Sequence, residues 1–228
     1  MNHAQLRASL ALWKRREAYR LGKWRAYRDK RAQTPRVLAL RHKWWGLYEI
    51  AREQVATREG QLKATEKKSK RLTAVMWAQA HVGVHEEPAG SNRGPLIDDW
   101  QRIFGFLAAP WCGIFCGNAL RAAGVRGVTS RIASVSAIQE DAEAGRAPFS
   151  HWTPHSAKGA LRGDLVVLFG PGKHVEIIEI VQGDGSVLDF GGNTSPAPGT
   201  GSEFAGGCVA HRKREASEIW GVAHVHYG

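Results

Sequence analysis

The sequence contains few cysteines and none of the common metal-binding spacings. Only three of its 228 residues are cysteine, which is too few to suggest a disulfide framework in a chain of this length. Cys112 and Cys116 lie four residues apart, a spacing that suits one face of a helix but not a mutual disulfide. Neither a CxxC nor an HExxH motif occurs, so the spacing gives no support for a zinc site.

Long apolar segments are also missing. The first twenty residues, MNHAQLRASLALWKRREAYR, contain no uninterrupted apolar core, unlike a secretory signal peptide. No later run approaches the roughly 20 apolar residues that a membrane-spanning helix needs. We therefore expect neither a signal peptide nor a transmembrane segment.

Charge is distributed unevenly along the chain. Residues 1–71 contain 20 Lys and Arg against six Asp and Glu, whereas residues 72–228 contain 12 against 15. A strongly basic segment is attracted to polyanions, such as nucleic acid, an anionic membrane surface or a phosphate-bearing wall polymer. The composition predicts two parts, 1–71 and 72–228.

The basic part has the pattern of two helices. Residues 4–32 contain apolar residues at helical spacing among Arg and Lys, and residues 36–70 repeat the pattern after Pro35. Proline disfavours helix in the residue before it and suits the first turn of the next helix. We therefore expect a helical hairpin whose aromatic residues pack the helices together. An alternative leaves Trp44 and Trp45 exposed for contact with sugar or lipid.

The second part changes from helical to strand patterns along its length. Residues 72–84 and 95–105 have helical spacing. Four later runs rich in Val and Ile predict strands: GDLVVLFG (163–170), KHVEIIEIV (173–181), SVLDFGG (186–192) and IWGVAHVHY (219–227). Helices followed by a strand meander are typical of an α+β fold.

One cysteine has the position of a nucleophile. The segment PWCGIFCGNALRAAGV predicts a helix that begins near Cys112. The positive end of a helix lowers the pKa of a thiol there and favours the reactive thiolate. Cys116, one turn later on the apolar face, fits a structural core position.

A cysteine nucleophile needs a base and a group that orients the base. His174 follows a Gly-Pro-Gly turn and begins a predicted strand, in which His174 and Glu176 share a face because strand side chains alternate. Asn193 and Asp189, in or just after the next strand, are further candidates for the orienting group.

The segment from about Leu72 to Tyr227 resembles the CHAP (cysteine, histidine-dependent amidohydrolase/peptidase) group of papain-like cell-wall hydrolases, which includes many phage lysins. Four pieces carry the resemblance in order: VGVHEEPAGSNRGPLIDDW, PWCGIFCGNALRAAGV, RGDLVVLFGPGKHVEIIEI and VLDFGGNTS. They cover about two-thirds of the chain and leave residues 1–71 unexplained.

The resemblance implies a papain-like catalytic domain with Cys112 as nucleophile, His174 as general base and Asn193 as the residue that orients His174. The family more often has a small residue where this chain has Glu176. The orienting role therefore stays open among Asn193, Glu176 and Asp189. The resemblance implies no cofactor, and the pair Asp98-Asp99 lacks the alternating acidic residues of a calcium loop.

The expected function is hydrolysis of an amide bond in bacterial peptidoglycan, by an N-acetylmuramoyl-L-alanine amidase or an endopeptidase, as in a phage lysin. Such a protein would stay in the host cytoplasm until its release to the cell wall, where residues 1–71 would bind an anionic wall polymer or membrane surface. The alternative is a binding protein whose basic arm contacts nucleic acid or an assembly partner. We expect no nucleic-acid partner because the sequence contains no recognised nucleic-acid-binding module.

Overall fold

The computed structural model describes residues 2–30, 34–196 and 206–228. They divide into two compact units, Met1–Lys68 and Ser69–Gly228. Helix α2 (Pro35–Ala80) contributes its longer, first part to one unit and its last turns to the other. We describe each unit separately.

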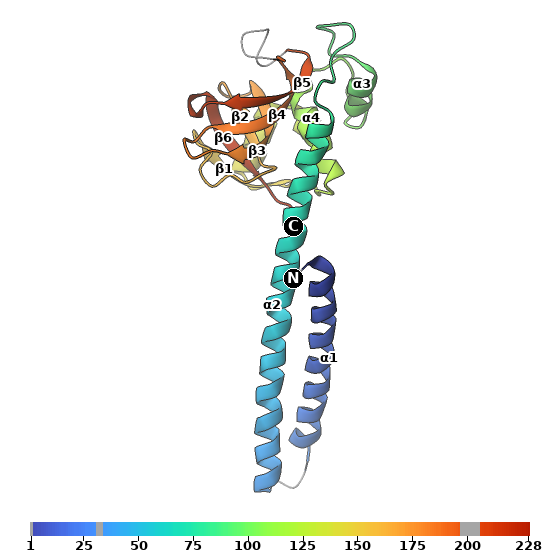
Figure 1. Ribbon diagram of the computed structural model, residues 1–228, viewed down its shortest axis with the longest axis vertical. Helices are drawn as coiled ribbons and strands as arrows, with labels where there is room; N and C mark the ends of the chain where they lie inside the picture. The colour runs from blue at the N-terminus through green and yellow to red at the C-terminus, as the bar shows by residue number, and fades with distance from the viewer. Residues whose placement is uncertain (1, 31–33, 197–205) are drawn as a thin grey trace. The chain divides into compact units, whose positions relative to one another are not determined.

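The first unit is a hairpin of α1 (His3–Arg28) and the first part of α2 (Figure 1). Asn2 and Gln5 form a reciprocal capping box at the start of α1, which satisfies amide groups that the helix leaves unpaired. The two helices run antiparallel, because Lys14 pairs with Glu59 at 2.8 Å whereas Trp24 packs on Trp45, with ring centroids 4.9 Å apart. The hairpin expected from the break at Pro35 is therefore present.

Helix α2 is longer than the sequence pattern predicted. We expected one helix to end near residue 70 and another to begin at Leu72, but α2 is continuous to Ala80. The prediction was wrong because it interpreted a change in composition as a change in structure. Residues 61–80 contain neither Gly nor Pro, so nothing in the local sequence ends the helix there.

The second unit places helices before a sheet, as the α+β prediction expected. After α2 come α3 (Pro95–Arg102), α4 (Cys112–Ala122) and α5 (Val135–Glu143). The sheet in the described part of this unit has six antiparallel strands in the order β1-β6-β2-β3-β4-β5. Their bounds are β1 (Phe149–Pro154), β2 (Leu165–Leu168), β3 (His174–Val181), β4 (Val187–Thr194), β5 (Cys208–Arg214) and β6 (Ile219–Val225).

Two of these strands were not predicted from the sequence. β1 has the sequence FSHWTP and β5 has the sequence CVAHRKR. Both contain polar or charged residues where the predicted strands have Val and Ile, and β1 ends on a proline. They lie at the two edges of the sheet, where one side of a strand has no neighbour and such residues are tolerated.

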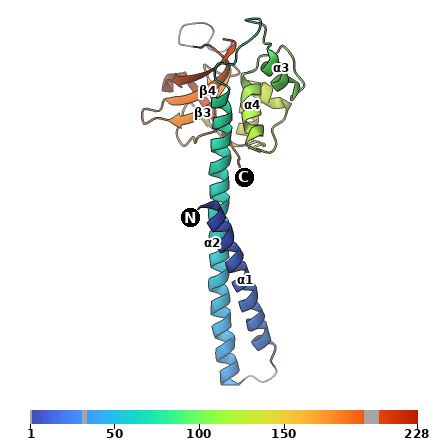
Figure 2. The same ribbon diagram turned by 45° about the vertical axis from the view of Figure 1, so that its right-hand side comes forward.

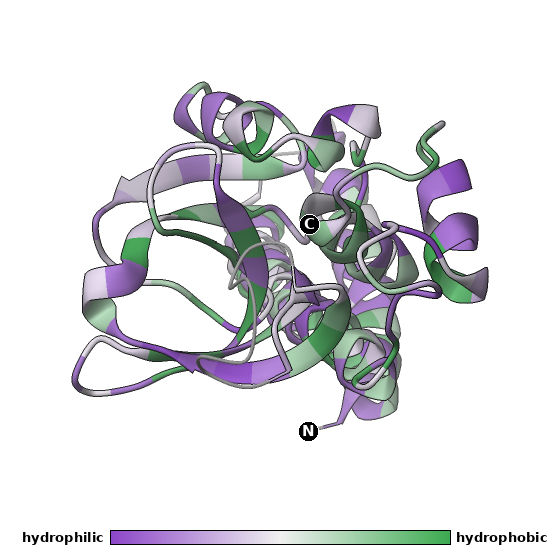
Figure 3. Ribbon diagram, turned by 90° about the horizontal axis from the view of Figure 1, so that it is seen from above, coloured by the Kyte–Doolittle hydropathy of each residue, from purple (hydrophilic) through white to green (hydrophobic). Residues whose placement is uncertain are grey.

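The sheet buries both of its faces. Side chains that alternate along β2 and β3 enter two apolar clusters, with Val167 and Val175 in one and Val166 and Ile178 in the other. Helix α4 belongs to the first cluster and lies beside β3 and β4 (Figure 2). Viewed from above, the strands follow a strongly curved path (Figure 3). This packing brings the start of α4 to the start of β3.

Arg71 forms several contacts within the second unit. Its guanidinium donates to the Asp164 carboxylate at 2.7 Å and to the backbone carbonyls of Arg162 and Val225, and it lies over the ring of Tyr227. The Asp164 side chain is completely buried. The contacts of Arg71 therefore satisfy a buried charge inside this unit.

Candidate active site

Cys112 is the first residue of α4 and is 5% exposed. The helix can approach its neighbours closely here because position 113 is glycine: a Cβ on Gly113 would collide with the backbone carbonyl of Ile132. The first amide groups of a helix have no partner within it and create a partial positive charge. The thiol therefore lies where a helix end favours a negative charge.

His174 and Glu176 lie together on β3. The His174 imidazole is completely buried, and its Nε2 is 3.0 Å from Glu176 Oε1. This distance places both side chains on one face of the strand, as the alternation predicted. Among the residues that the structure describes, His174 Nδ1 has no partner in hydrogen-bond geometry. That nitrogen is the one left to exchange a proton with Cys112.

Arg214, the last residue of β5, holds the Glu176 carboxylate on its other side. Its Nε lies 2.8 Å from Oε2 and its Nη2 lies 2.6 Å from Oε1. Arg214 is 1% exposed and also donates to Thr194 Oγ1 at 3.0 Å. A bidentate pair of this kind fixes the carboxylate in position as well as charge, so Glu176 presents an oriented acceptor to His174.

The electrostatic environment favours a charged Cys112–His174 pair. Burial opposes ionisation of the Cys112 thiol, but the interaction with His174 outweighs burial and leaves the pKa below its ordinary value of 9.0. Burial also lowers the pKa of His174, whereas Cys112 and Glu176 raise it more strongly, to about 9. The two groups are thus close enough for each to stabilise the charged form of the other.

Asp189 lies in the same network without contacting His174. Burial and the negative charge of Glu176 raise the pKa of Asp189 well above its ordinary value. Neither carboxyl oxygen has a hydrogen-bond partner within the described part of the chain. This environment favours the neutral form of Asp189, whereas the contacts of Glu176 favour its ionised form.

The Asn193 side chain forms its hydrogen bonds with residues other than His174. The Asn193 amide nitrogen donates to Asn92 Oδ1 at 3.3 Å, and Asn193 Oδ1 accepts from the Gly207 backbone amide at 3.3 Å. These contacts connect the end of β4 with Asn92 and with Gly207, the residue before β5. Of the three residues left open for the orienting role, Glu176 is the one that contacts the imidazole.

A pair of glycines in β4 makes room for this arrangement. A Cβ on Gly191 would overlap the Glu176 carboxylate, whereas a Cβ on Gly192 would overlap Trp111 and Phe115. Gly191 therefore leaves room for the Glu176 carboxylate on one face of the sheet. Gly192 leaves room for Trp111 and Phe115, so α4 can pack on the other face.

The other two cysteines are placed differently from Cys112. Cys116 is completely buried in the apolar core, where burial raises its pKa well above the ordinary value. Cys208 donates to the Thr194 carbonyl at 3.0 Å. All three thiols are free, and the core position expected for Cys116 is confirmed.

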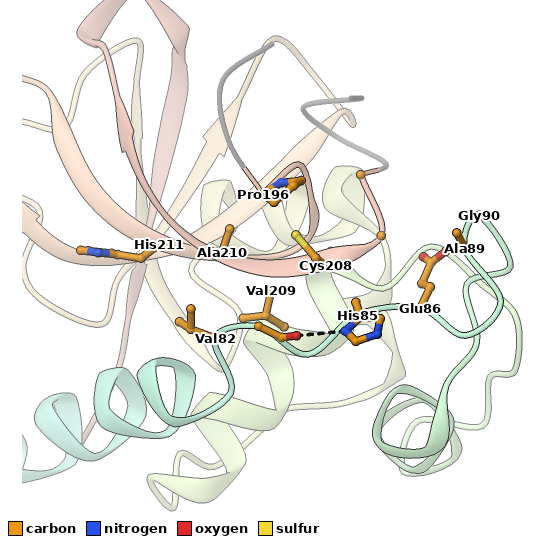
Figure 4. Close-up of a pocket in the computed structure, with 13 residues that line it drawn as sticks. Val82, His85, Glu86, Ala89, Gly90, Pro196, Cys208, Val209, Ala210 and His211 are labelled. Atoms are coloured by element: carbon orange, nitrogen blue, oxygen red, sulfur yellow. Dashed lines mark hydrogen bonds between the residues drawn. The ribbon is translucent and has the colours of Figure 1, made fainter. Parts of the chain in front are cut away.

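A pocket of about 570 Å³ lies between the segment that follows α2 and β5 (Figure 4). Its lining does not include Cys112 or His174 and consists of Val82, Gly83, His85, Glu86, Ala89, Gly90, Pro196 and residues 206–211. Glu86 connects the two regions, because this pocket-lining residue accepts from the Trp111 indole at 2.9 Å and Trp111 directly precedes Cys112. One lining residue of the pocket thus contacts the side chain that precedes the candidate nucleophile.

Sequence reasoning missed Arg214 and Glu86. Arg214 is the last cation of HRKR, in a segment that gave no strand pattern, and its partner Glu176 is 38 residues away. Glu86 is one of two adjacent glutamates before a proline, a pattern typical of a turn. A buried Trp before the nucleophile, whose N–H needs an acceptor, was the one available signal for Glu86.

In residues 2–30, 34–196 and 206–228, no group of three or more His, Cys, Asp or Glu side chains is arranged to hold a metal ion. No helix of this part of the chain is both long and apolar enough to span a membrane. Comparisons of the chain with protein-family models, with curated proteins and with solved structures find no match.

Proposed function

We propose that this protein is a cysteine amidohydrolase or peptidase that hydrolyses an amide bond in peptidoglycan, as a phage lysin does. The observation that carries the proposal is the arrangement at the meeting point of α4 and β3. A thiol at a helix start neighbours a buried imidazole, which is itself held by a carboxylate–guanidinium pair. Acyl transfer by a cysteine needs a nucleophile, a base beside it and a group that orients the base.

The proposed reaction begins with attack of the Cys112 thiolate on the amide carbonyl carbon. A C–S bond forms and the carbonyl electron pair moves to oxygen, where the Cys112 amide N–H stabilises the oxyanion. Collapse of this intermediate breaks the C–N bond, and His174 gives its proton to the leaving amine. His174 then takes a proton from water, which attacks the thioester and releases the acid and Cys112.

Glu176 acts in this scheme as the positioning residue. It fixes Nε2 of the imidazole, directs Nδ1 toward Cys112 and stabilises the imidazolium. Arg214 keeps Glu176 ionised: burial alone would raise the pKa of this carboxyl, but the contacts with Arg214 and His174 lower it.

The choice of peptidoglycan rests on the resemblance of residues 72–227 to CHAP hydrolases. The strongly basic hairpin supports it, because an enzyme of this kind works at anionic bacterial surfaces. Amidase and endopeptidase activities use the same three side chains, and both belong to the proposal.

The test is digestion of purified peptidoglycan by the wild type and by Cys112→Ala, with mass spectrometry of the soluble fragments. We expect new amine-terminated fragments from the wild type alone, and their masses identify the bond. A Cys116→Ala variant is the matched control and should retain activity. Equal products from wild type and Cys112→Ala would remove Cys112 from the mechanism. No products from the folded wild type on several wall types would favour a binding protein.

A further inference from the structure

One face of the hairpin, near the connection between its helices, carries aromatic and cationic side chains together. Arg41 and His42 lie three and four residues after Leu38 and four and three residues before Trp45, so each of them shares a side of α2 with both apolar residues. Trp24 of α1 packs against Trp45, with centroids 4.9 Å apart. We call these five residues the indole patch.

The indole patch exposes apolar surface that the hairpin does not bury. Leu38 is 38% exposed and Trp45 is 39% exposed. Trp24, Arg41, His42 and Trp45 also line a shallow pocket of about 240 Å³. The guanidinium of Arg28 lies over the Trp24 ring, 5.0 Å from its centroid. The patch thus offers indole rings flanked by cations around a depression large enough for a small polar group.

The charge around the patch selects an anionic partner. Residues 20–49 contain nine Lys and Arg against two acids, Asp29 and Glu49, and Asp29 pairs with Arg28 at 2.6 Å. Two other acids of the hairpin, Glu59 and Glu66, pair with cations near the opposite end of α1. A second copy of the chain would bring two clusters of like charge together, so charge disfavours self-association through this face.

We propose that the indole patch binds the surface of an anionic phospholipid bilayer. Cations attract the phosphate headgroups, while tryptophan rings settle at the boundary between headgroups and acyl chains. A bilayer also gives Leu38 and Trp45 an apolar environment, which the phosphates of nucleic acid or of a wall polymer do not. The inference concerns surface binding alone and does not depend on the proposed reaction.

The test is sedimentation of the full-length protein with vesicles of phosphatidylglycerol and phosphatidylethanolamine, compared with vesicles of phosphatidylcholine. We expect binding to the anionic vesicles that weakens as salt rises. Arg28→Glu/Arg41→Glu should reduce the affinity at least about tenfold, because each cation near such a surface contributes about 1 kcal/mol. Leu38→Ala/Trp45→Ala, which keeps the charge, should also reduce it severalfold.

The matched control is Lys63→Glu/Lys67→Glu, the same charge change at exposed positions of α2 outside the patch. Circular dichroism checks that each variant keeps its helix content. Equal losses from the two charge variants would overturn the patch as the site. So would full affinity of Leu38→Ala/Trp45→Ala, since binding would then depend on net charge. Failure to bind vesicles, or binding to double-stranded DNA alone, would overturn the bilayer as the partner.

Discussion

At the scale of single residues, two histidine contacts decide the chemistry that the site can support. Nε2 of His174 faces an ionised carboxylate, and Nδ1 is left for the thiol. A charged imidazolium interacts favourably with the Glu176 carboxylate on one side and with the Cys112 thiolate on the other. The charged form is therefore favoured, which explains why burial does not lower the net pKa of His174.

This environment predicts how the reactivity of Cys112 depends on pH. The pKa of Cys112 is lowered, so at pH 6–7 its alkylation rate should exceed that of a thiol with an ordinary pKa near 8.5. His174→Ala leaves burial unopposed and should reduce the rate at pH 6.5 by about tenfold or more. Alkylation with iodoacetamide, followed by mass spectrometry of the peptide, measures this rate.

Cys116 provides an internal reference in the same experiment. Its pKa is raised by burial, so it should stay unmodified throughout this pH range. Equal alkylation rates for wild type and His174→Ala at pH 6.5 would contradict the ion-pair interpretation.

At the scale of elements, the sequence predicted β3 but not the contacts that its side chains make with other strands. Strand alternation placed His174 beside Glu176, because that relation depends on neighbouring residues alone. Arg214 reaches Glu176 from β5 across β4, and no local pattern specifies a contact between strands that do not adjoin. For the same reason, the sequence could not decide which of Asn193, Asp189 and Glu176 contacts the imidazole of His174.

The glycine pair in β4 gives a prediction at this scale. Gly191→Ala places a methyl group against the Glu176 carboxylate, so we expect a loss of about 1–3 kcal/mol in stability and slower alkylation of Cys112. Gly60→Ala is the control, because this helical position has no neighbouring atom within 4 Å. It should raise stability by about 0.5–1 kcal/mol. Thermal unfolding and the alkylation assay measure both effects, and an unchanged Gly191→Ala protein would contradict the packing argument.

At the scale of the whole molecule, the position of Arg71 determines where the second unit can be separated from the first. Composition placed the boundary after Arg71, whereas the compact units divide at Lys68 and Ser69. A fragment that begins at Leu72 would lose the guanidinium that pairs with the buried Asp164. Asp164 would keep His224 Nδ1 at 3.0 Å and the backbone amides of Leu161 and Val225 as partners. The cost is therefore at the lower end of the range for a broken buried ion pair, about 3 kcal/mol at most.

We therefore expect fragment 69–228 to be more stable than fragment 72–228. A loss of about 3 kcal/mol would lower the melting temperature of a unit of this size by roughly 10 °C. Differential scanning calorimetry of both fragments measures the difference. Arg71→Met in fragment 69–228 should reproduce it, and identical melting temperatures would show that the contacts of Arg71 contribute little.

The placement of His174 and Glu176 two residues apart on one strand has a mechanical consequence. Their separation is set by the covalent geometry of β3, so sliding of β3 against its neighbours moves both side chains together. The separation between Cys112 and His174, in contrast, depends on how α4 packs on β3. Substitutions that change how α4 packs on β3 should therefore alter the rate of the first chemical step while leaving the orientation of the base intact.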